Sequence, residues 1–208
     1  MTPPQSALGK ELWTKYKSSS AADVHNALWR GSEPSYQGPV NSLVEDALRA
    51  FDSGAYAGAT LAARAALEAA CYLFLTRSHV DLNRGTSKLY LPKTPKGEDA
   101  VTRFEGLAKE LCGRDVLSSE NCKALWRIKE HGDIAAHLVE RDSKSLAKPI
   151  KYPRKGRIMP WDSQSKQDLI DTIAILEEIA DSIVRKPHLM GPSAAMLGAN
   201  KNERPEGV

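Results

Sequence analysis

Residues 57–75 constrain the fold more than any other stretch, because they are apolar on nearly every side of a helix. The stretch carries only two charged residues, Arg64 and Glu68, and no proline. Alanine and leucine, which dominate it, are strong helix formers, and a helix that is apolar nearly all round is buried nearly all round. We therefore expect a helix from about residue 55 to residue 76 at the centre of a helical protein.

A second helix is expected at residues 125–137, LWRIKEHGDIAAH. At about 100° per residue, its side chains divide into an apolar side that includes Gly132 and a polar side that includes Asp133 and His137. A glycine inside a helix costs about 1 kcal/mol relative to alanine, so we expect another helix to approach closely there. The small residues of the first helix suit that approach. We predict that the two helices are direct neighbours and pack backbone to backbone through Gly132 and Ala62.

Three further segments show helical periodicity, at about residues 41–52, 99–112 and 163–184. In the last of them, apolar residues recur at alternating spacings of four and three, the pattern of a seam along a bundle. The seam residues are Leu169, Ile173, Leu176, Ala180 and Ile183. No strand pattern is visible in the sequence. We predict an all-α fold, an up-and-down bundle of four to five helices.

The predicted domain organisation has three parts. Residues 1–40 form an N-terminal extension whose short helices lie against the bundle, and residues 41–185 form the bundle. Residues 186–208, rich in proline, glycine and asparagine, are expected to be a flexible, disordered tail. Residues 79–98 hold two prolines and two glycines and are expected to form a loop.

Composition narrows the class of protein. Hydrophobic residues at 41% and charged residues at 26% are ordinary for a globular protein, and a net charge of +3 does not by itself indicate nucleic-acid binding. The three cysteines are scattered, which argues against a zinc ribbon or a disulfide framework and suits a reducing cytoplasm. Neither a signal peptide nor an uncharged apolar stretch of membrane-spanning length is visible, so we expect no membrane association.

His137 is the first candidate for chemistry. It lies one helical turn after Asp133, so the two side chains can meet. A carboxylate beside an imidazole fixes its tautomer and suits it to general acid–base work, whereas the alternative is a histidine that is hydrogen-bonded for structure. Glu130 points the same way as this pair, but the spacing lacks the two-histidine pair of helical zinc sites. We therefore expect neither a metal nor a cofactor.

Arg64 and Glu68 form a second candidate pair, spaced to meet on one helix. Apolar residues share their stripe, so we expect the pair to be at least partly buried, and buried charges need partners. One reading is a structural network. The other is an extension of the His137 site, in which Arg64 or Glu68 reaches across to Arg127 or Asp133.

The segment 141–157 is the third candidate, because it carries seven basic residues against one acidic residue. Such an excess suits contact with a phosphate backbone, and a solvated linker is the alternative. The residues that we expect to contact nucleic acid are Lys148, Lys151, Arg154, Lys155 and Arg157.

Two segments together, AYAGATLAARAALEAACYLFL and ALWRIKEHGDIAAH, resemble the bacterial domain-of-unknown-function family 4145. That family belongs to the HEPN superfamily of helical nucleotide-binding domains, and the resemblance covers about residues 41–184. It implies an up-and-down helical bundle, often dimeric across the motif helices. Active members of the superfamily cut RNA without a metal, using an arginine, a following polar residue and a histidine near the end of one helix.

Transferred to this chain, Asp133 takes the polar position and His137 the histidine position. The arginine position falls on Gly132, which cannot hold a phosphate. Arg127 or Arg64 could substitute, although neither placement matches the superfamily pattern. The residues expected to support the site are Arg64, Glu68, Glu130 and His131.

Three functions follow from the sequence. The preferred one is a HEPN-like module, dimeric, that binds RNA or acts alongside it in a prokaryotic defence or toxin–antitoxin setting, with catalysis reduced or absent. Its partner would be a second copy of the chain and a defence-system or antitoxin protein. The second is a metal-independent endoribonuclease that uses His137, Asp133 and Arg127. The third is a structural bundle that serves for dimerisation or partner binding.

Overall fold

The computed structural model describes residues 3–24, 39–76, 104–144, 161–186 and 189, and of residues 39, 76 and 137–144 it describes the backbone alone. Every element in these ranges is helical, so the predicted all-α fold is confirmed. The elements are α1 (Ala7–Ser18), a 3-10 helix η1 (Ser20–Asp23), α3 (Pro39–Asp52), α4 (Tyr56–Thr76), α5 (Phe104–Gly113), α6 (Ser119–Lys144) and α7 (Trp161–Arg185).

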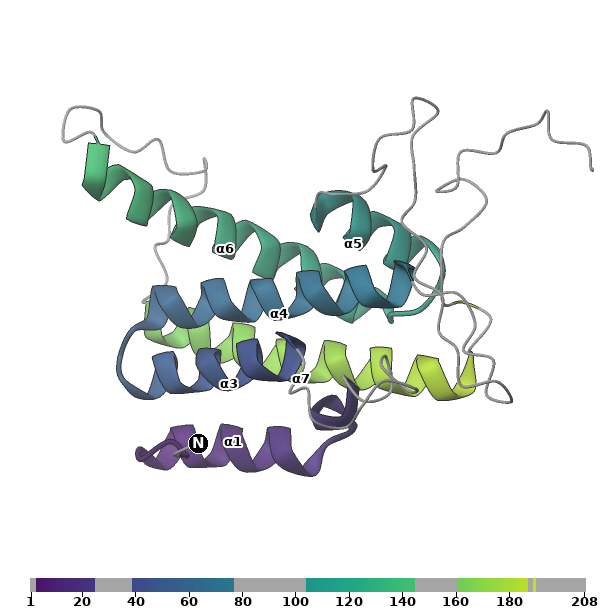
Figure 1. Ribbon diagram of the computed structural model, residues 1–208, viewed down its shortest axis with the longest axis horizontal. Coiled ribbons are helices and arrows are strands. Elements are labelled where there is room, and N and C mark those ends of the chain that lie inside the picture. Colours follow the sequence, from purple (N-terminus) through teal and green to yellow (C-terminus); the bar gives the residue numbers. More distant parts are fainter. Residues whose placement is uncertain (1–2, 25–38, 77–103, 145–160, 187–188, 190–208) are drawn as a thin grey trace, which may run out of the picture.

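Helix α4 is the centre of the bundle, as its composition predicts. It packs against α3, α5, α6 and α7, and it crosses the middle of the molecule in Figure 1. The four long helices α3, α4, α6 and α7 alternate in direction along the chain (Figure 1). The predicted up-and-down bundle is therefore present, with α5 as a short addition beside α4.

Among the described helices, α4 alone has the length and apolar composition that crossing a membrane would require. Its surroundings are those of a core helix, because Ala63, Leu67 and Ala70 are fully buried by neighbouring helices. A helix buried inside a bundle passes the same test of length and composition.

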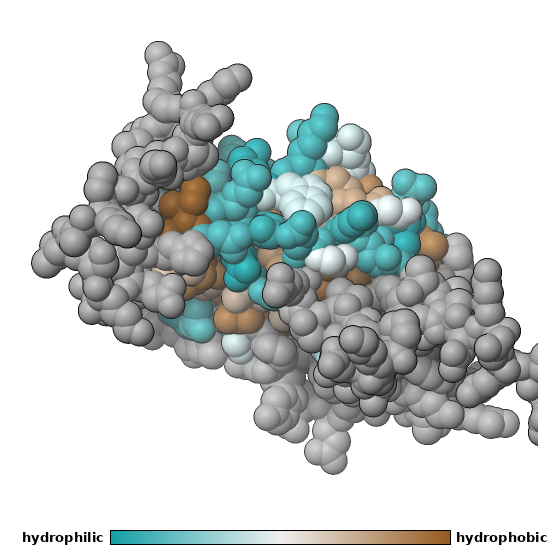
Figure 2. Space-filling view, turned by 90° about the horizontal axis from the view of Figure 1, so that it is seen from above, coloured by the Kyte–Doolittle hydropathy of each residue, from teal (hydrophilic) through white to brown (hydrophobic). Residues whose placement is uncertain are grey.

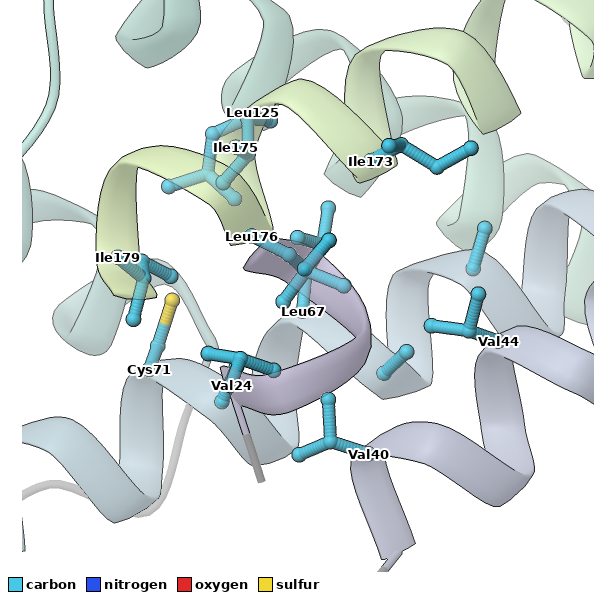
Figure 3. Packing of buried hydrophobic residues seen from close by; sticks show 14 of the residues in the cluster. Val24, Val40, Val44, Leu67, Cys71, Leu125, Ile173, Ile175, Leu176 and Ile179 are labelled. Atoms are coloured by element: carbon cyan, nitrogen blue, oxygen red, sulfur yellow. The ribbon is translucent and has the colours of Figure 1, made fainter. Parts of the chain in front are cut away.

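The core forms where α4 meets α7. Figure 3 shows Leu67 and Cys71 of α4 beside Leu176 and Ile179 of α7, with Val24 of the N-terminal segment closing over them. All the seam residues predicted in the last helix are buried. Burial also raises the pKa of the Cys71 thiol to about 12, and the charge of Glu68 adds to the effect.

The N-terminal extension packs on the bundle, as expected: α1 lies against α3, and η1 lies against α7. Tyr16 is completely buried, and this burial is the main reason that its pKa lies above the ordinary value. The entry to α1 is tied to the end of α3 by Asp52, whose carboxylate accepts hydrogen bonds from the backbone N–H groups of Gln5 at 2.7 Å and Ser6 at 2.8 Å.

The connection between α5 and α6 corrects one expectation, because a disulfide joins Cys112 to Cys122. The chain reverses direction between them, with Asp115 at a φ of 53°, and this turn brings the two Cα atoms to 5.8 Å. A spacing of ten residues does not show such a reversal in the sequence. The cysteines therefore no longer count as an argument for a reducing cytoplasm.

Candidate functional site

The motif helix and the central helix are direct neighbours, as predicted, but their contact differs from the prediction. Gly132 of α6 faces the Arg64 side chain of α4 and not the alanine stripe. A Cβ atom built on Gly132 would lie 2.8 Å from Arg64 Cβ and 3.0 Å from Cγ, and closer still to Cδ. Real Cβ atoms are not found so close to other carbon atoms. The missing side chain of Gly132 therefore leaves the space that the aliphatic part of Arg64 occupies.

The Arg64 guanidinium lies between two carboxylates. Its Nη2 is 3.0 Å from Asp133 Oδ1, and its Nη1 is 3.4 Å from Glu68 Oε2. The ring of Phe104 lies 5.5 Å from the guanidinium carbon, within the range of a cation–π contact. The side chain is 22% exposed, which confirms the prediction of partial burial. Arg64 does reach Asp133, and this contact fits the reading of a structural network as well as that of an extended His137 site.

Asp133 has a cation on each oxygen. Arg64 occupies Oδ1, and Lys129 Nζ lies 2.9 Å from Oδ2. His137 belongs to α6, but its side chain lies outside the described residues. The predicted pairing of Asp133 with His137 therefore stays a prediction, and the bonds that the structure gives Asp133 run to two other side chains.

Arg127 does not join this cluster and turns to α7 instead. Its guanidinium forms an ion pair with Asp171 and lies 3.9 Å, through Nε, from Asp168 Oδ1. His131, which the sequence places on the border of the polar side, also faces α7. Its Nδ1 lies 3.0 Å from both carboxylate oxygens of Asp168.

Asp168 is the centre of a polar cluster that sequence reasoning missed. It is 0% exposed, and Thr60 of α4 donates a hydrogen bond to its Oδ2 at 3.2 Å. Ser165, one turn earlier on α7, lies 2.9 Å from the Thr60 hydroxyl and donates to the Tyr56 carbonyl at 2.7 Å. Three helices therefore meet at this cluster through side-chain hydrogen bonds.

A signal for this cluster exists in the sequence. Ser165, Asp168 and Thr172 recur at spacings of three and four beside the apolar seam of α7. Polar residues at such positions are buried together with the seam, and most buried polar groups have partners. Ser165 and Asp168 have them, whereas the buried Thr172 hydroxyl has none among the described residues. The pattern could therefore have indicated a buried polar cluster, although not the identity of its partner on α6.

The remaining predicted site residues belong to neither of these two clusters in the described part of the chain. Glu130 is exposed on α6. Lys148, Lys151, Arg154, Lys155 and Arg157 lie outside the described residues. Within the part of the chain that the structure describes, no three His, Cys, Asp or Glu side chains are grouped as a metal site would require. Figure 2 looks onto the side where α5 and α6 lie, and most of the coloured surface there is hydrophilic.

Comparison of the chain with models of known protein families, with curated proteins and with solved structures finds no match.

Proposed function

We propose that the chain is a HEPN-like helical module that binds nucleic acid, RNA in the first place, with little or no catalysis at the Asp133–His137 motif. The observation that carries the proposal is the pairing of Arg64 with Asp133 across Gly132. A guanidinium held by two carboxylates is poorly placed to stabilise a developing phosphorane, because its charge is already compensated. Asp133 is likewise engaged by two cations and cannot easily serve as the orienting carboxylate of a histidine.

The case for nucleic acid comes from charge and from chain continuity. Helix α6 runs without a break through Arg141 to Lys144, the first two basic residues of the segment 141–157. A phosphate polymer that contacts this segment would therefore lie close to the C-terminal end of the motif helix. The setting that we propose with it is a cytoplasmic one, in prokaryotic defence or toxin–antitoxin action, with a homodimer and a defence-system or antitoxin protein as partners.

Filter binding of single-stranded RNA at 50 and 200 mM salt tests the proposal. Each phosphate contact that is lost reduces the slope of log K against log salt by about 0.7, so the triple variant Lys151→Gln, Arg154→Gln, Lys155→Gln should reduce it by about 2. The matched control is Lys10→Gln, Lys15→Gln, Lys166→Gln, which removes the same charge from exposed positions on α1 and α7.

Affinity that is absent at 50 mM salt, or that does not change with salt, would contradict RNA binding. If His137→Ala then alters the sedimentation coefficient of the chain, a structural dimer becomes the better account of the motif.

A metal-independent endoribonuclease is the second candidate, because the side chain of Arg64 fills the space over Gly132, the residue at the arginine position of the motif. For catalysis, the Arg64 guanidinium would have to leave Asp133, which it contacts at 3.0 Å one turn before His137. RNA cleavage in EDTA by the native chain and by His137→Ala decides the matter. Equal cleavage by both proteins, or cleavage by neither, rejects this candidate.

A further inference from the structure

Helix α5 is the shortest α-helix in the described part of the chain, and it lies at the outside of the bundle beside α4 and α6 (Figure 1). A helix of ten residues is not stable on its own in water, so its place depends on what holds it. Its buried residues are Phe104, Leu107, Ala108 and Leu111. The disulfide adds a covalent tie, from Cys112 in the last turn of α5 to Cys122 in the first turn of α6.

The turn between the two cysteines is also held by α7, through bonds that involve neither sulfur atom. The Ser182 hydroxyl donates to the Val116 carbonyl at 3.1 Å, and the Ser118 backbone N–H donates to the Glu178 carboxylate at 2.8 Å. These bonds can therefore keep the two cysteines near each other after the disulfide is reduced. A pair of thiols that stay close together can form the disulfide again.

The disulfide is within reach of a thiol in solution and restricts the opening of α5. Cys112 and Cys122 are both partly exposed, whereas the third cysteine, Cys71, is fully buried. When α5 and the turn detach together, the disulfide still confines the chain between its two ends. For a sequence separation of ten residues, loss of this restriction favours the open state by a factor of up to about 10² in the chain-entropy model.

The other end of α5 covers the Arg64–Asp133 pair. The ring of Phe104, the first residue of α5, lies 5.5 Å from the guanidinium carbon of Arg64. The same guanidinium contacts Asp133 at 3.0 Å. When α5 detaches from α4, the ring leaves with it, and that side of the guanidinium becomes open to solvent.

We propose that the Cys112–Cys122 disulfide is a reversible redox switch that sets how often α5 detaches from α4 and α6, and thereby the exposure of Arg64. The reductant is a dithiol. One of its thiolates attacks a sulfur of the disulfide and forms a mixed disulfide, while the other cysteine sulfur leaves and takes up a proton. The second thiol of the reductant then displaces the remaining cysteine. The dithiol loses two electrons and two protons and becomes a disulfide, and the protein gains them as two thiols.

The switch goes beyond the proposed function and requires no nucleic acid. Hydrogen exchange of the full chain, oxidised and after reduction with dithiothreitol, tests it by mass spectrometry of peptides. We expect the backbone amides of α5 and the following turn to exchange faster by a factor of about 10 to 10² after reduction. The amides of α7 should exchange at unchanged rates. Oxidised glutathione, added after removal of the dithiothreitol, should restore the slow exchange of α5.

Phenylglyoxal, which modifies exposed arginines, tests the second part of the proposal. Modification of Arg64 should become faster after reduction. Modification of Arg127 should not change, because this residue pairs with Asp171 of α7 and lies away from α5 in the ion pairs that it forms.

Two variants separate the disulfide from other effects of the reagents. The double variant Cys112→Ser, Cys122→Ser should exchange as the reduced chain does, with or without dithiothreitol. The control Cys71→Ala keeps the disulfide and should respond to dithiothreitol as the native chain does. Circular dichroism shows whether each variant is folded, and the comparison of the oxidised with the reduced native chain needs neither of them.

Several outcomes would overturn the inference. One is equal exchange of α5 in the two redox states, and another is an Arg64 modification rate that does not follow them. Loss of protection in α7 together with α5 would make the disulfide a constraint on the whole fold instead of a switch. A disulfide that dithiothreitol opens only in denaturant, or that oxidised glutathione does not restore, would show that the bond is not reversible in the folded protein.

Discussion

At the scale of single residues, Gly132 shows how a residue that is unfavourable locally can be required by a neighbour. Its missing side chain leaves the space that the aliphatic part of Arg64 fills. Packed in this space, Arg64 places its guanidinium next to Asp133. The cost of glycine in a helix, about 1 kcal/mol relative to alanine, is thereby offset in part by the packing of the Arg64 side chain and by an ion pair that is partly exposed to water.

Gly132→Ala should destabilise the protein by about 1–2 kcal/mol, although alanine is the better helix former. The new methyl group would displace Arg64 at its Cβ and Cγ atoms, and overpacking of this kind costs about 1–3 kcal/mol. The control is Gly58→Ala in α4, where a Cβ atom would meet its nearest neighbours at 3.9 and 4.0 Å, an ordinary contact distance. That variant should be neutral or stabilised by up to about 1 kcal/mol. Urea denaturation measures the free energy of unfolding of both variants. A Gly132→Ala variant that is more stable than the native protein would contradict the close packing of Arg64 against Gly132.

At the scale of elements, side-chain hydrogen bonds decide how the helices are joined. Asp52 at the end of α3 holds the start of α1, and Asp168 of α7 joins α4 and α6. Glu178 of α7 accepts a hydrogen bond from the Ser118 backbone N–H at 2.8 Å, at the start of α6. Asp52 and Glu178 satisfy backbone N–H groups beside helix starts that would otherwise be left without partners, whereas Asp168 binds side chains from within two helices.

The contribution of Asp52 to stability should depend on pH. Hydrogen bonds from the Ser6 side chain, and then from the backbone N–H groups of Gln5 and Ser6, lower the pKa of Asp52 below its ordinary value of 3.8. The contribution is thus fully present above that ordinary value and is lost as the pH falls through the lower pKa of the folded state. Asp52→Ala should reduce the Tm at pH 7, and the gap to the native protein should narrow in acid. Glu11→Gln, at an exposed position on α1, is the control; a gap that is constant down to pH 2 would contradict the linkage.

At the scale of the whole molecule, one continuous hydrophobic core joins the N-terminal extension to the bundle. Tyr16 of α1, Val24 after η1 and Leu67 of α4 belong to the same cluster of buried residues. The extension is therefore part of the folded unit and not a separate arm. Removal of its helices would expose apolar surface of α3 and α7.

Thiol titration tests the packing of this whole unit. Three cysteines are present, two of them in the disulfide and the third, Cys71, fully buried with a pKa of about 12. Without reductant, a disulfide-exchange reagent at pH 8 should therefore detect no thiol in the native protein and one in guanidinium chloride. The Cys71→Ser variant should show none in either state. A thiol that reacts in the native protein would contradict the close packing of α4.

Much of the fold was determined by the sequence alone, because a helix repeats every 3.6 residues and shows which side of itself is apolar. This periodicity predicted the central helix, the seam of α7 and the partial burial of Arg64 and Glu68. It also predicted that α4 and α6 are neighbours. The site is different, because the rotation of one helix against the next decides which polar side chains meet. Only the tertiary structure therefore decided that Gly132 receives Arg64, and that Arg127 and His131 turn to acidic residues of α7, some forty positions further along the chain.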